Sequence, residues 1–174
     1  MGKLPNSPVE ARFAATLFLL LLGVANAFGA WQVRQFAAFT PSGVAGAVGS
    51  SASGSGERPV SIEELNAPEH HIDRRLLVQD SHVHLPAYAM TAAFLSLIVL
   101  GLRLSSSVRM AVIGAAFAAP VLDFAGLWGA HLSGVATRLW AAVALAGGFA
   151  MAAVYLLVLV ITIRQCWLTR KEVS

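Results

Sequence analysis

The stretch LWAAVALAGGFAMAAVYLLVLVITI, residues 139–163, contains no charged residue and decides the fold of this chain. It is long enough to cross the hydrocarbon core of a bilayer, which takes a helix of ~20 residues. Three other apolar runs of similar length lie at Phe13–Trp31, Leu85–Leu104 and Met110–Leu132. We therefore expect an all-α protein, a transmembrane four-helix bundle with spans at about 13–34, 84–104, 108–132 and 137–163.

The composition supports the same class. Hydrophobic residues make up 57% of the chain and charged residues 12%, whereas a soluble domain averages about 25% charged residues. The spans use most of the 174 residues, so we expect a single integral membrane domain over residues 1–174, without a separate soluble catalytic domain. An enzyme is therefore the less favoured class, and the lone Cys166 excludes an intrachain disulfide.

The basic residues predict the orientation of the spans rather than a nucleic-acid partner. With the N-terminus inside, seven Lys and Arg residues fall on the cytoplasmic side and five on the outer side. Positive charge marks cytoplasmic loops, so we expect a multi-pass protein of a bacterial inner (cytoplasmic) membrane with both termini cytoplasmic. An alternative is that Ala25-Asn26-Ala27 ends a cleaved signal peptide, which would leave three spans. We favour a retained first span because its apolar run continues to Trp31.

One sizeable connection, the outer loop at about residues 38–81, joins the first two spans. Residues 41–58 are rich in Gly and Ser and are expected to be flexible. Ser61-Ile62-Glu63-Glu64 has the pattern of a capping box, and residues 69–79 carry an apolar stripe, so two short surface helices are expected after it. A partly ordered connector is the alternative.

Asp123 is the polar residue in the spans that most needs an explanation. An ionised Asp near the centre of a membrane helix costs roughly 2.5–3.5 kcal/mol on insertion scales. It is therefore expected to face the bundle interior, as part of a site or in a structural polar pair with Arg34.

Three histidines lie near the expected outer ends of the spans. His82 and His84 open the second span, and His131 ends the third. Tyr88 is four residues beyond His84 and shares its helical face. Imidazoles ligate first-row metals and haem iron, so His82, His84 and His131 are candidate metal ligands, and Tyr88 and Asp123 extend a candidate cofactor site. The same groups could bind a quinone head group or relay protons. The alternative is that the histidines are interfacial and Asp123 only fixes the bundle.

Two other histidine patterns carry less weight. Asp80-x-His82-x-His84 is similar to a metal motif of amidohydrolases, but their barrel needs about 250 residues and alternating strands and helices. His70-His71 with Asp73 is interpreted as a solvated group on the loop rather than as a metal site.

Small residues are frequent in the last two spans, where they let helix backbones approach closely. A compact bundle, or one part of a larger assembly, is expected. The expected partners are the lipid bilayer and other membrane proteins or further copies of the chain; no nucleic acid is expected.

Three short motifs, Thr40-Pro41-Ser42-Gly43-Val44, Ser81-His82-Val83-His84-Leu85 and Leu122-Asp123-Phe124 with Trp128, carry a resemblance. On them the chain resembles small four-span bacterial integral membrane proteins of unassigned function, with a His-x-His at the start of the second span. This resemblance implies no established activity. The His-x-His is also similar to that of haem–copper oxidase subunits, but the chain is too short for such a subunit and lacks its other histidines.

Three hypotheses follow. The first is a non-catalytic accessory or scaffold protein of a membrane assembly, respiratory or redox in character. The second is a small haem- or metal-binding membrane protein with an outward-facing His/Asp site, in which His84 is the preferred ligand. The third is a transporter component that depends on Asp123.

Overall fold

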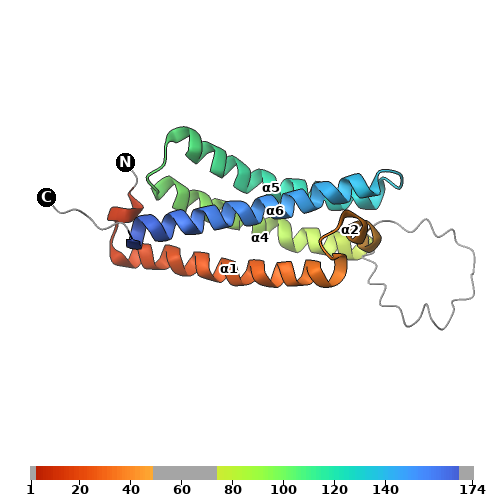
Figure 1. Ribbon diagram of the computed structural model, residues 1–174, viewed down its shortest axis with the longest axis horizontal. Helices are drawn as coiled ribbons and strands as arrows, with labels where there is room; N and C mark the ends of the chain where they lie inside the picture. The colour runs from red at the N-terminus through yellow and green to blue at the C-terminus, as the bar shows by residue number, and fades with distance from the viewer. Residues whose placement is uncertain (1–2, 49–73, 169–174) are drawn as a thin grey trace, which may run out of the picture.

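The computed structural model describes residues 3–48 and 74–168, which contain helices and no strand (Figure 1). Four helices are long and apolar enough to cross a membrane, so the chain is a multi-pass membrane protein built as a transmembrane helical bundle, as the sequence predicts. The elements are η1 (Leu4–Asn6), α1 (Val9–Ala37), α2 (Pro41–Val48), α4 (Arg74–Gly101), α5 (Ser106–Leu132), α6 (Thr137–Ile163) and the π-helical turn η2 (Arg164–Leu168).

The two ends of the bundle differ. We call the end that holds η1, η2 and the α4–α5 connection the terminal end, and the end that holds α2 and the α5–α6 connection the loop end (Figure 1). Because four helices cross in alternation, the first and the last described residues lie at the same end.

The second long helix begins earlier than the sequence predicts. α4 starts at Arg74, ten residues before the expected span start at 84. Leu77 and Ser81 are buried on the side that α4 turns toward its neighbours, so packing extends the helix beyond its apolar run. Residues 74–79 are therefore the first turns of α4 and not part of a separate surface helix.

A second correction concerns the segment after α1. Residues 41–58 are expected to be flexible, yet Pro41–Val48 forms α2. Thr40 caps this helix, since its Oγ1 accepts a hydrogen bond from the backbone N–H of Gly43 at 3.0 Å, and Val44 and Val48 are buried. The remainder of that segment, the capping box at Ser61 and the pair His70-His71 lie outside the described residues.

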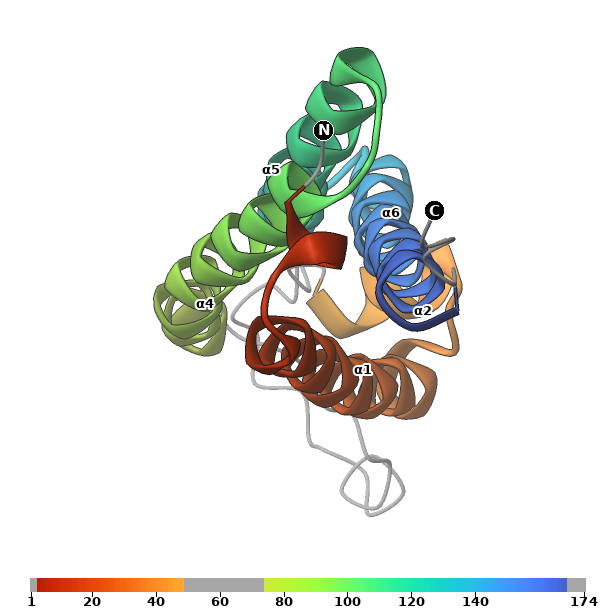
Figure 2. The same cartoon turned by 90° about the vertical axis from the view of Figure 1, so that its left-hand side faces the viewer.

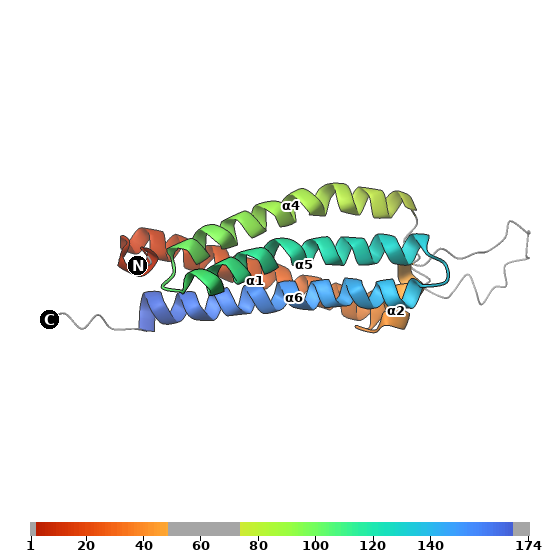
Figure 3. The same ribbon diagram turned by 90° about the horizontal axis from the view of Figure 1, so that it is seen from above.

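Among the described residues, α5 and α6 form the most extensive helix contact; they lie together toward the loop end and separate toward the terminal end (Figures 1–3). Glycines make this approach possible. A Cβ on Gly126 would lie 2.7 Å from the Cβ of Ala144, and a Cβ on Gly147 would lie 2.8 Å from the backbone oxygen of Ala119. The small residues of these spans therefore serve the helix contact that the sequence predicts.

The α1 and α4 helices are close at the terminal end and diverge toward the loop end, as the end-on view shows (Figure 2). The rings of Phe18 and Phe94 contact each other across the closed part, with centroids 5.4 Å apart. Two buried clusters result. One fills the terminal half and includes Leu19, Leu95 and Val158, and the other lies under α2 at the loop end.

Candidate functional site

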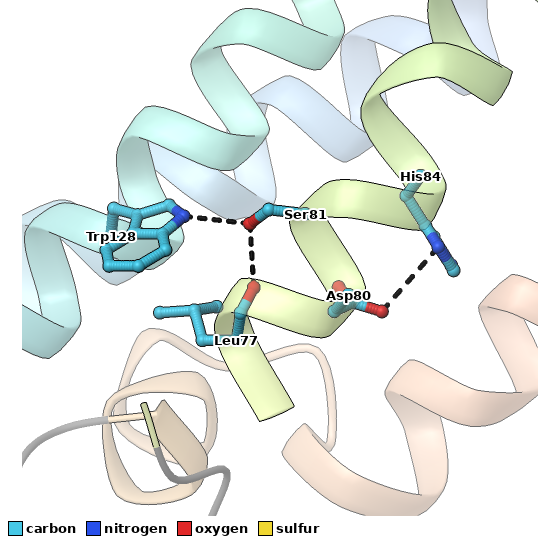
Figure 4. Close-up of polar contacts among 5 residues, drawn as sticks. All are labelled: Leu77, Asp80, Ser81, His84 and Trp128. Carbon is cyan, nitrogen blue, oxygen red and sulfur yellow. Dashed lines mark hydrogen bonds and ion pairs between the residues drawn. The ribbon is translucent and has the colours of Figure 1, made fainter. Parts of the chain in front are cut away.

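Ser81 fixes the position of α4 against α5 near the loop end. Its hydroxyl donates to the backbone oxygen of Leu77 at 2.7 Å and accepts from the indole Nε1–H of Trp128 at 2.9 Å (Figure 4). Ser81 is buried, so both bonds form where water is scarce. This contact holds the neighbouring polar residues of α4 at a defined depth relative to α5.

Polar side chains follow one another along a single face of α4. The Nδ1 atom of His84 lies 3.6 Å from the carboxylate of Asp80, four residues earlier, and both side chains are about half exposed (Figure 4). The ring of Tyr88, four residues later, meets the His84 ring edge-on with centroids 5.9 Å apart. The three groups therefore form a line of roughly 12 Å that runs from the loop end into the membrane-spanning region.

Asp123 reaches the same region from α5. It occupies the packed face of that helix, since Ala116, Ala119 and Ala130 lie four or seven residues away and are buried. The next residue, Phe124, contacts the Tyr88 ring with centroids 5.9 Å apart. The Asp123 side chain is half-buried and within electrostatic range of the Asp80, His84 and Tyr88 side chains. We call Asp80, His84, Tyr88 and Asp123 the loop-end polar cluster.

The terminal part of the same α4 face is closed. Ala92 lies one helical turn beyond Tyr88 and Leu95 about two turns beyond it; both are buried in the apolar core, whereas Asp80 and His84 are accessible. This face of α4 is thus exposed near the loop end and buried in the apolar core nearer the terminal end.

The other candidate histidines lie elsewhere. His82 is exposed. The Nδ1 atom of His131 lies 2.9 Å from the backbone oxygen of Val48, so this side chain links α5 to the end of α2, and its ring also contacts Trp128. Within residues 3–48 and 74–168 no three His, Cys, Asp or Glu side chains are grouped to hold a metal ion. The geometry therefore lends no support to a site shared by His82, His84 and His131.

The expected pair of Arg34 and Asp123 is likewise not formed by these two described residues. Arg34 is exposed near the end of α1, which packs mainly on α2 and α6. The ion pair found in this region joins two other residues, Asp80 and His84.

Sequence reasoning passed over two parts of this region. Asp80 and His84 are four residues apart, the spacing of neighbours on a helix. The sequence analysis places residues up to 81 in a loop and therefore does not predict this pair. The Ser81–Trp128 hydrogen bond joins residues far apart in the chain, so no local sequence pattern predicts it.

Comparison with known proteins adds one match. A family model described as a transmembrane helical domain matches residues 67–173, which include α4, α5 and α6 and leave out α1 and α2. No curated protein and no solved structure matches the chain.

Proposed function

We propose that this chain, which belongs to a family of transmembrane helical domains whose model matches more than half of it, is a non-catalytic accessory protein that binds other membrane helices through α1. The observation that carries this proposal is the unequal packing of the four spans. Within the most apolar window of each span, 6% of the residues are buried in α1, against 22%, 33% and 28% in the other three.

The α1 helix is joined to the bundle at few points. Leu19 is fully buried in the core of the terminal half, and Ala37 is buried under α2 at the loop end. Between them, Gly23 lies directly against the hydroxyl of Tyr155. Large apolar side chains such as Leu21 and Phe28 are more than two-thirds exposed. Lipid or another helix must cover this surface in a membrane.

Two small residues on the exposed side of α1 favour another helix, and not lipid alone, as the group that covers this surface. Ala25 and Gly29 are four residues apart and exposed, and nothing lies within 4 Å of a Cβ built on Gly29. Small residues at this spacing let a second helix approach closely and pack its side chains against the backbone. Elsewhere in the bundle, Gly126 and Gly147 already serve such contacts.

Photo-crosslinking in native membranes tests this proposal. A diazirine-bearing residue replaces Gly29 in one variant and Trp31 in the control. Trp31 is 69% exposed and lies about 160° away round the helix. We expect a discrete protein adduct from position 29 and mainly lipid adducts from position 31. Lipid adducts alone at both positions would show that the bilayer covers α1 and would refute the proposal.

We also propose that the terminal end faces the cytoplasm and that the protein resides in an inner membrane, because the excess of Lys and Arg lies at that end. Val135, in the α5–α6 connection, and Ser107, at the start of α5, are both exposed and lie at opposite ends. With Cys166 replaced by Ser, a membrane-impermeant maleimide applied to intact cells should label Val135→Cys. It should label Ser107→Cys only after permeabilisation. The reverse pattern would invert the orientation.

A further inference from the structure

The terminal end of the bundle carries positive charge that its own contacts do not neutralise. Within residues 3–48 and 74–168, five basic side chains lie at this end, Lys3, Arg12, Arg103, Arg109 and Arg164, and Glu10 is the one carboxylate there. Arg12, Arg103 and Arg109 donate hydrogen bonds to backbone or amide oxygens, which are neutral. These bonds position the guanidinium groups and leave their charge available to an anion from outside the described chain.

Arg12 has the most defined surroundings of these side chains. Its Nη1 donates to the backbone oxygen of Cys166 at 3.0 Å, and its guanidinium lies 5.4 Å from the centre of the Trp167 ring. The indole Nε1–H donates in turn to the Oγ1 of Thr16 at 3.0 Å. The first turns of α1 and the π-helical turn η2 thus hold a cation and an aromatic ring together. Arg12 is half-buried and Trp167 is 44% exposed, so both can contact a group at the membrane surface.

Apolar side chains continue from this pair toward the middle of the membrane. Phe13 and Leu17 of α1 are 55% and 48% exposed, and α1 has the lowest share of buried residues of the four spans. Arginine and tryptophan at the end of such a surface lie at the depth of the lipid head groups. A cation and an indole next to exposed apolar side chains match a molecule in which a phosphate is joined to acyl chains. A soluble anion would use only the cation.

From the juxtaposition of Arg12 and Trp167 with the exposed apolar side chains of α1, at the positively charged end of the bundle, we infer that the protein binds an anionic phospholipid there in preference to a zwitterionic one. The lipid phosphate contacts the Arg12 guanidinium, the indole lies beside the glycerol region, and the acyl chains follow Phe13 and Leu17. The other basic side chains of the terminal end attract the same head group over a longer distance. This inference does not depend on the binding of a partner helix near Gly29.

Quenching of Trp167 fluorescence tests the inference, because the other three tryptophans lie toward the loop end. The purified full chain is reconstituted in phosphatidylcholine vesicles that contain a fixed minor fraction of brominated phosphatidylglycerol or, in parallel, of brominated phosphatidylcholine. The Trp167 signal is the difference between each chain and the same chain with Trp167→Phe. We expect the anionic lipid to be preferred beside Trp167 by about fivefold, the factor that corresponds to one arginine near anionic lipid.

Variants of two arginines identify the charge responsible. Arg12→Gln should bring the two brominated lipids to nearly equal quenching, whereas Arg12→Lys keeps the charge and should retain most of the preference. A movement of the Trp167 ring alone would change the quenching by both lipids and cancel in their ratio. Arg138→Gln removes an exposed arginine at the loop end and should leave the ratio unchanged.

Inorganic phosphate, compared with chloride at the same ionic strength, separates a lipid from a free anion. We expect the two salts to weaken the preference equally, by screening alone. The inference is overturned if the wild type is quenched equally by both lipids, if Arg12→Gln and Arg138→Gln give the same ratio, or if a folded Arg12→Lys variant loses the preference. Loss of the preference in phosphate but not in chloride would assign the site to a soluble anion and would also overturn it.

Discussion

Two adjacent glycines of α6 allow the packing of the α5–α6 hairpin to be measured with an internal control. A Cβ on Gly147 would lie 2.8 Å from the backbone oxygen of Ala119 and 2.9 Å from the Cα of Asp123, whereas a Cβ on Gly148 would have nothing within 4 Å. Ordinary Cβ contacts begin at 3.4 Å, so the backbones at Gly147 would have to separate by at least 0.6 Å, the difference between 3.4 and 2.8 Å. Both substitutions to Ala add the same methyl group to the same helix.

The expected magnitude follows from comparing the two variants. Each gains helix propensity of about 1 kcal/mol when Gly becomes Ala, so this gain cancels in the difference. Only Gly147→Ala adds the overlap, and overpacking by one methyl group costs about 1–3 kcal/mol. We therefore expect Gly147→Ala to have a free energy of unfolding lower than that of Gly148→Ala by about 1–3 kcal/mol.

Reversible unfolding of the purified protein in mixed micelles, by titration with sodium dodecyl sulfate, provides the assay. Helix content followed by circular dichroism, together with Trp fluorescence, gives the midpoint and slope for each variant. Equal stability of the two variants, or a less stable Gly148→Ala, would refute the close approach of α5 and α6 at this point.

Three other outcomes are expected from the same preparation. Trp128→Phe should lower the free energy of unfolding by about 0.5–1.5 kcal/mol through loss of its hydrogen bond to Ser81, and a double-mutant cycle with Ser81→Ala should show coupling between the two sites. Gly23→Ala should destabilise the protein because its methyl group meets the hydroxyl of Tyr155, and Tyr155→Phe in the same chain should restore most of the loss; additive effects would contradict this contact. His131→Ala should raise the hydrogen exchange of residues 41–48, since α2 loses its side-chain link to α5, whereas unchanged protection would show that the buried valines of α2 suffice.

The sequence predicts the long elements of this fold well because a bilayer imposes one simple requirement. A run of apolar residues such as 139–163 must be helical, since lipid cannot satisfy the hydrogen-bonding groups of the backbone. The start of α4 is harder to predict because hydropathy does not determine it. Burial of Leu77 and the hydrogen bonds of Ser81 hold the first turns in a helix, and both depend on tertiary neighbours.

The candidate site can likewise be predicted from the sequence only in part. The spacing of His84 and Tyr88 follows from helical periodicity, and their rings do meet. The positions of His131 and Arg34 relative to the cluster depend on how α2 and α1 pack at the loop end, which is a tertiary property. That two polar residues lie near the same expected end of their spans therefore does not predict that their side chains lie together.

Two arginines at the terminal end also stabilise the fold. This matters for experiments that change the topology of the protein by removing charge. The Nη1 of Arg12 donates to the backbone oxygen of Cys166 at 3.0 Å, and its guanidinium lies 5.4 Å from the centre of the Trp167 ring. Arg109 donates to two backbone oxygens in the connection that follows α4. The charges that we propose orient the chain during insertion thus also complete the hydrogen bonding of helix ends in the finished bundle. Deleting either arginine to invert the protein would weaken the fold at the same time, so charge should instead be added at the opposite end.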